Sequence, residues 1–275
     1  MGVSDLPRVS ALIAVFTWCG QPAAAEPVDV ELIIAADASS SVDSEEGRFQ
    51  RSGYAAAFRN PKVVTAIRSG ARGRIAVLYF EWSGDEDKRI VAGWTAIDDR
   101  ASAWAFAEVL GAMPFVNGGR TSLSGAIDFA ATLFEGNGYE GQRRIIDISA
   151  NGENNMGRRV DVARDDALAA GITIIGLPVM IDRPGDTEWP PMPEFGWYFE
   201  DCVIGGQAAF SLIARGRNAF ATAVLGKLVL EIAGIEPWRG RGRPVAVRPV
   251  AEHTRTPCDI GEQRWEHLQH YSYPR

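Results

Sequence analysis

Histidine and cysteine are both scarce in this chain of 275 residues, and the scarcity limits its chemistry. There are three histidines, and all of them lie at or beyond residue 253. A serine hydrolase needs a histidine base, and a zinc site usually needs clustered histidines or cysteines. The sequence therefore argues against an enzyme. His267 and His270 form the one pair that a metal-assisted hydrolase could use, although two histidines at this spacing are more often a solvated helix face.

The chain also lacks an excess of basic residues. Its formal net charge is -7 and its isoelectric point is about 5.1. A nucleic-acid-binding surface needs a basic field that displaces counterions from phosphate, so the composition argues against a nucleic-acid partner. An acidic surface instead tolerates cations. No segment beyond the N-terminus has the roughly 20 consecutive apolar residues of a transmembrane helix.

The N-terminus has the pattern of an export signal. Arg8 precedes an apolar run over residues 11–20, and Ala23 and Ala25 satisfy the small-x-small rule for cleavage. We expect residues 1–25 to be a signal peptide and the mature protein to be periplasmic or secreted.

Two cysteines, Cys202 and Cys258, remain after this cleavage. Exported proteins enter an oxidising compartment, where paired cysteines commonly form disulfides. We therefore expect a disulfide between them, with two free thiols as the alternative.

Short apolar runs alternate with amphipathic segments from Val28 onward, which is typical of an α/β fold. Five of these runs are predicted strands, over residues 28–36, 74–82, 89–97, 143–149 and 172–180. Only five residues separate the second strand from the third, so that pair is predicted to be antiparallel. Helices are predicted after Asp43 and over residues 99–113, 122–134, 157–171 and 217–234. We assign residues 26–235 to one domain and 236–275 to an arginine-rich C-terminal extension.

The first predicted strand ends in the stretch DASSS, which contains Asp37, Ser39 and Ser41. A serine nucleophile would need a nearby base and a Gly-x-Ser-x-Gly elbow, and a phosphate loop would need glycines and a lysine; both are absent here. A polar loop that caps a helix remains possible. One carboxylate and two hydroxyls are hard oxygen ligands suited to Mg²⁺, Mn²⁺ or Ca²⁺. Two further loops at element ends offer Thr121 and Asn151.

These three loops, in this order, resemble the metal-ion-dependent adhesion site of von Willebrand factor A domains. The stretches that carry the closer likeness, to a bacterial family of exported von Willebrand factor A-like proteins, are DASSSVDSEEGRFQRSGYAAAFRNP, IAVLYFEWSG, RRIIDISANGENN, GITIIGLPV and DCVIGG. The resemblance covers roughly residues 28–234. It implies a doubly wound, mostly parallel sheet with one antiparallel edge strand, helices on both faces and a metal at the carboxyl ends of the strands.

The resemblance also implies a role for each loop residue. Ser39 and Ser41 would contact a divalent cation, Mg²⁺ before Mn²⁺ or Ca²⁺, whereas Asp37 would act through water. Thr121 would be a switchable ligand, and a carboxylate from a protein or peptide partner would complete the shell. We therefore expect a metal-dependent binding module and not an enzyme.

One position departs from the family pattern. The third loop normally carries Asp before Gly, and this chain has Asn151 there. Asn keeps an oxygen but removes one negative charge, which lowers the affinity for a cation. Asp147 and Glu153 are nearby acids, and strand alternation argues against Asp147 as a substitute. A structural domain with a vestigial site is accordingly the main alternative function, ahead of a metal-assisted hydrolase.

Overall fold

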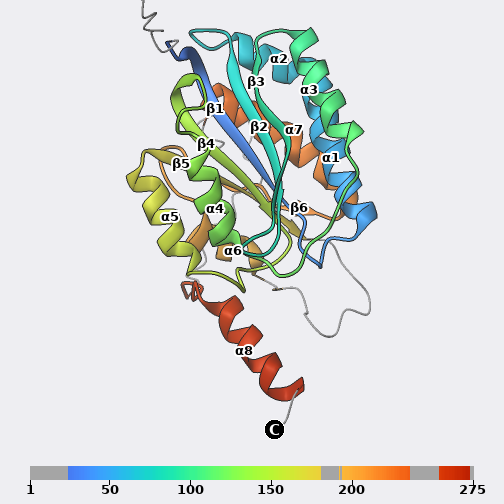
Figure 1. Ribbon diagram of the computed structural model, residues 1–275, viewed down its shortest axis with the longest axis vertical. Coiled ribbons are helices and arrows are strands. Elements are labelled where there is room, and N and C mark those ends of the chain that lie inside the picture. Colours follow the sequence, from blue (N-terminus) through green and yellow to red (C-terminus); the bar gives the residue numbers. More distant parts are fainter. Residues whose placement is uncertain (1–23, 181–191, 193, 236–253, 273–275) are drawn as a thin grey trace, which may run out of the picture.

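The computed structural model describes residues 24–180, 192, 194–235 and 254–272 (Figure 1), so most of the expected signal peptide lies outside the described residues. The strands are β1 (Glu26–Asp37), β2 (Ile75–Trp82), β3 (Lys88–Ile97), β4 (Tyr139–Ala150), β5 (Ile172–Met180) and β6 (Ala214–Arg215). They form one sheet in the order β3-β2-β1-β4-β5-β6. Strand β3 is antiparallel to β2, and the other neighbours are parallel. All five predicted strands are present.

Helices cover both faces of this sheet (Figure 1). One face carries α1 (Ser44–Arg59), α2 (Pro61–Arg68), α3 (Arg100–Ala112) and α7 (Arg217–Ala233). The other face carries α4 (Leu123–Thr132), α5 (Val160–Ala169), α6 (Phe195–Tyr198) and the short π-helix η1 (Phe199–Val203). Helix α8 (Ile260–Ser272) extends away from the body of the domain. The prediction of a doubly wound, mostly parallel sheet with one antiparallel strand is confirmed.

Strand β1 lies in the interior of the sheet and is buried on both sides. Val30, Leu32 and Ile34 point into the core under α1 and α7, whereas Ile33 and Ala35 point into the core under α4 and α5. This explains why the strand is a continuous apolar run and not an alternating one. The chain leaves β1 toward β2 on one side and reaches β4 on the other, so the order of the sheet reverses between β1 and β4. Open α/β sheets bind ligands at the carboxyl ends of strands flanking such a switch point.

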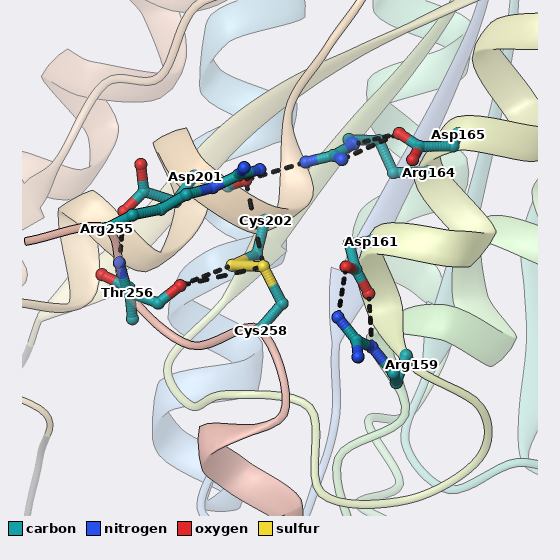
Figure 2. A network of polar contacts seen from close by, with 9 residues as sticks. All are labelled: Arg159, Asp161, Arg164, Asp165, Asp201, Cys202, Arg255, Thr256 and Cys258. Atoms are coloured by element: carbon teal, nitrogen blue, oxygen red, sulfur yellow. Dashed lines mark hydrogen bonds and ion pairs between the residues drawn. A yellow bond between two sulfur atoms is a disulfide. The ribbon is translucent and has the colours of Figure 1, made fainter.

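The predicted disulfide between Cys202 and Cys258 is confirmed (Figure 2). It joins η1 to the segment that precedes α8, with the two Cα atoms 5.4 Å apart. Beside it, the backbone N–H of Thr256 donates to the Asp201 carboxylate over 2.8 Å. The disulfide therefore fixes the start of α8 against the domain.

Among the residues that the structure describes, no helix has both the length and the apolar character needed to span a bilayer.

Candidate metal site

The first and third loops of the candidate site emerge side by side because β1 and β4 are parallel neighbours. Ala36 of β1 pairs with Ser149 of β4, close to the carboxyl end of each strand. Asp37, the last residue of β1, and Asn151, the first residue after β4, therefore meet at the edge of the sheet formed by the carboxyl ends of its strands. This edge is the switch point of the sheet.

Four of the predicted side chains are joined by hydrogen bonds at this edge. The Asp37 carboxylate accepts from the backbone N–H of Ser39 over 2.7 Å and from that of Asn151 over 3.3 Å. The hydroxyls of Ser39 and Ser41 are 3.1 Å apart. The Ser41 hydroxyl donates to the Asn151 side-chain oxygen over 2.6 Å. We call Asp37, Ser39, Ser41 and Asn151 the oxygen ring.

The loop that carries Thr121 is held against the first loop by backbone hydrogen bonds. Gly118 N–H donates to the Ala38 carbonyl over 2.7 Å, and Ser40 N–H donates to the Gly119 carbonyl over 2.8 Å. These two bonds run in opposite directions between the same two segments. They place Thr121 at the same edge of the sheet as the oxygen ring.

Thr121 is tied to the third loop as well. Its N–H donates to the Asn155 side chain over 3.0 Å, and its carbonyl accepts from Asn155 N–H over 2.9 Å. A Cβ built on Gly152 would lie 3.9 Å from the Thr121 hydroxyl, so this hydroxyl faces the turn that follows Asn151. The five predicted site residues thus lie on three adjoining loops at the carboxyl ends of the strands.

The charged group of the oxygen ring is the Asp37 carboxylate, and Asp37 is 1% exposed. Burial raises the pKa of Asp37 from 3.8 to about 6. The side chain of Ser39 and the N–H groups of Ser39 and Asn151 lower this pKa, and the Glu46 carboxylate adds to the rise. A nearby cation would favour the charged carboxylate. The surrounding hydroxyl and amide oxygens are hard donors, which are the ligands that Mg²⁺ prefers. The residues present therefore fit a small divalent cation.

Glu46, in the first turn of α1, also borders this site, although the sequence pattern did not predict it there. Its side chain is 1% exposed, and one of its carboxylate oxygens accepts from the Asn151 side-chain N–H₂ over 3.4 Å. Asn151 consequently bridges Ser41 and Glu46 through the two ends of its amide. The one sequence signal for Glu46 is its position shortly after DASSS, in the first turn of the helix that follows this loop.

The other two acids near Asn151 turn away from the oxygen ring. Asp147 is fully buried and forms an ion pair with Lys227 of α7, so its carboxylate is engaged in the core. Glu153 is also buried, and it forms an ion pair with Arg264 of α8.

The sheet order, the two helical layers and the polar loops at the switch point define a von Willebrand factor A-like domain. Residues 27–236 match the model of a protein family described as DUF1194, a protein of unknown function. Because this match spans most of the chain, the protein belongs to that family. No curated protein matches the sequence.

Several solved structures share this fold at low sequence identity. Proximal thread matrix protein 1 from the mussel byssus superposes with a TM-score of 0.52 at 15% identity, covering 76% of this chain and 48% of that one. The pilus adhesin SpaC from Lactobacillus rhamnosus GG gives 0.52 at 12% identity, with 76% and 31% covered. A von Willebrand factor type A protein from Catenulispora acidiphila gives 0.50 at 17% identity, with 75% and 43% covered. The chain spans less than half the length of these proteins, and the likeness establishes the fold alone.

Proposed function

We propose that this protein is an exported binding module that recognises a protein or peptide partner through a face organised by a divalent cation. The observation that carries the proposal is the oxygen ring, with Thr121 beside it, at the switch point of the sheet. The five residues come from three separate loops. Their convergence is explained by a shared ligand better than by the capping of one helix.

Each residue has a distinct role in this proposal. The Ser39 and Ser41 hydroxyls would contact the cation, and Thr121 would contact it in one state of the loop. Asp37 and Asn151 would hold coordinated water, because the Asp37 carboxylate accepts from Ser39 N–H and the Asn151 side-chain oxygen accepts from the Ser41 hydroxyl, which keeps both oxygens next to the serines. A bound Mg²⁺, or Mn²⁺ or Ca²⁺ in its place, supplies an open coordination position for a carboxylate of the partner. This role needs no bond to be made or broken, so we assign no enzymatic activity.

The assignment to an exported protein is supported by the disulfide. Cys202 and Cys258 are both buried and joined, as expected for a protein that folds in an oxidising compartment. Together with the signal-like pattern of residues 1–25, this favours a periplasmic or secreted location.

A structural domain with a vestigial site is the second candidate. It is favoured by Asn151, which lacks the charge of the usual Asp, and by the hydrogen bond with which Asn151 engages Ser41. In this alternative the oxygen ring is a polar connection between β1 and β4, and it stabilises the edge of the sheet without an ion.

Calorimetric titration of the purified protein with Mg²⁺, Mn²⁺ and Ca²⁺ separates the two candidates. We expect saturable binding of at least one of these ions by the parent protein and loss of it in Ser39→Ala. Ser52→Ala is the matched control, because Ser52 lies on the exposed side of α1 and donates only to the Phe49 carbonyl. Absence of binding by the parent protein would favour the vestigial site, and equal binding by Ser39→Ala would place the ion elsewhere.

A further inference from the structure

The first turns of α8 lie against the loop that follows β4. The Asn154 side-chain N–H₂ donates to the Glu262 carboxylate over 2.7 Å, and Arg264 forms an ion pair with Glu153. At Gly261 the approach is so close that a Cβ would lie 1.9 Å from the Asn154 carbonyl oxygen. Glycine at this position is therefore required for α8 to dock on the third loop.

A second contact joins α8 to the loop that carries Thr121. The guanidinium of Arg120 lies over the ring of Trp265, 4.2 Å from its centroid. Arg120 directly precedes Thr121 in the chain. A cation stacked on an indole is an attractive contact that strengthens as the pair is removed from water.

One residue that α8 contacts, Asn154, also ties the third loop to neighbouring elements. Asn154 is fully buried, and its side-chain oxygen accepts from Ser124 N–H over 3.0 Å at the start of α4. Its own N–H donates to the Tyr198 hydroxyl over 3.1 Å. Buried polar groups of this kind need their partners, so removing α8 would leave the Asn154 and Glu153 side chains with fewer of them.

The disulfide keeps α8 at this location. Cys258 lies just before the helix and is bonded to Cys202 of η1, and Arg255 donates to the Asp201 carbonyl over 3.3 Å (Figure 2). Such a tether raises the local concentration of α8 at the third loop. Contacts that would be weak between separate molecules are thereby made persistent.

We propose that α8 is a positioning element of the candidate metal face. By holding Arg120 and Glu153, it fixes the two loops that present Thr121 and Asn151. The link to cation binding rests on the proposed function, whereas the effect of α8 on the two loops does not. Arg120, Glu153, Arg264 and Trp265 are positioning residues, because they act through the two loops and none of them is a proposed ligand of the cation.

The test compares four substitutions in α8 of the full chain. Trp265→Ala and Arg264→Ala each remove one contact to the site loops. Gln263→Ala is the matched control on the same helix, because the Gln263 side chain is exposed. Arg264→Lys keeps the charge and should restore most of what Arg264→Ala loses.

Amide hydrogen exchange in metal-free protein measures the positioning directly. We expect exchange in residues 118–122 and 151–155 to quicken by roughly tenfold in Trp265→Ala and Arg264→Ala, because local opening becomes easier, and to stay unchanged in Gln263→Ala. Exchange at the parent rate in both variants would overturn the positioning role.

Calorimetry on the same proteins tests the link to the ion. We expect the dissociation constant for Mg²⁺ or Mn²⁺ to rise roughly fivefold or more in Trp265→Ala and Arg264→Ala. A fivefold change is at the lower limit of the coupling usually found between two sites. An unchanged constant in both variants, with a parent protein that binds, would overturn the proposed link. Faster exchange in the loops, with no binding by any of the proteins, would support the positioning role and contradict the proposed function instead.

Discussion

Asp37 and Asp147 sit at similar depth on adjacent strands, but their surroundings differ. Both carboxylates are essentially buried, near the carboxyl ends of β1 and β4 respectively. Asp37 accepts from two backbone N–H groups and borders the hydroxyls of the oxygen ring. Asp147 instead faces the ammonium group of Lys227.

The Asp147 cluster is completed by Glu231, whose carboxylate lies 2.9 Å from Lys227 Nζ. Burial raises the pKa of Asp147 and of Glu231, and the charge of Lys227 acts against that rise in both. The chain therefore supplies its own cation to the buried acids of the core.

A buried aspartate is thus stabilised in two different ways in this protein. In the core, an ammonium from α7 pairs with the acid and is sealed from water. At the edge of the sheet, neutral donors hold Asp37, and the partly exposed Ser41 and Asn151 connect it to solvent. A divalent cation from solution would complete this second arrangement in the way that Lys227 completes the first.

Removing the core cation should have the largest effect on the folded protein. Lys227→Met leaves two buried acids without their ammonium partner, and breaking a buried pair in this way costs about 3–5 kcal/mol of unfolding free energy. Urea denaturation of the parent protein and of Lys227→Met measures this loss, with a chelator present so that bound metal does not contribute. A loss below about 1 kcal/mol would mean that the acids adapt by taking up protons.

The core cluster should also make stability depend on pH. Burial raises the pKa of Glu231 from 4.5 to about 7 in the folded protein. Below pH 4.5 Glu231 is protonated in both the folded and the unfolded protein. Between pH 4.5 and about 7 it is ionised in the unfolded chain but still protonated in the folded protein. The free energy of unfolding should therefore fall as pH rises through this window, by on the order of 1–3 kcal/mol. Denaturation across the window should show a smaller slope for Glu231→Gln, and equal slopes would contradict this assignment.

Asn151→Asp adds a negative charge to the oxygen ring and leaves the Asp147–Lys227–Glu231 cluster of the core unchanged. Asn and Asp are nearly isosteric, so the packing should change little. We expect affinity for Mg²⁺ or Mn²⁺ to rise about tenfold, which corresponds to about 1.4 kcal/mol. Calorimetry provides the value, and Ser39→Ala in the same background should abolish the gain. No gain in Asn151→Asp would indicate that charge is not what limits the site.

Asp37→Asn should have the smallest effect on stability. It removes a buried charge, but Asn has one acceptor oxygen, so one of the two backbone hydrogen bonds is lost at a cost of about 1 kcal/mol, and the two changes offset each other. We expect the unfolding free energy of the metal-free protein to stay within about 1 kcal/mol of the parent value, with cation binding lost. A loss as large as that of Lys227→Met would show that Asp37 serves the fold and not a ligand.

Most of the sheet could be predicted from the sequence because its interior strands are continuous apolar runs. Strand β6 was not predicted, since two residues carry no periodic pattern. Helix α2 was also missed: Asn60 both ends α1 and caps α2, and Pro61 follows at once, so the two helices are not separated by a loop.

The residues of the oxygen ring could be predicted because each lies at or just after the end of a strand, or just before a helix. The topology of the sheet brings the carboxyl ends of neighbouring parallel strands together. The surroundings of the ring could not be predicted. Glu46 was hidden by its place in an ordinary first helical turn, and its contact with Asn151 depends on how α1 packs. The docking of α8 joins segments that are more than 100 residues apart, as the separation of 111 between Glu153 and Arg264 shows. No local pattern reports such a contact.

Anomalous diffraction from crystals of the protein grown with Mn²⁺ tests the central claim most directly. We expect one strong anomalous peak at the carboxyl ends of the strands, within bonding distance of the Ser39 and Ser41 hydroxyls and next to Asp37 and Asn151. The peak should be missing in Ser39→Ala crystals grown in the same way. A parent crystal with saturating Mn²⁺ and no peak between these two serines would contradict the account.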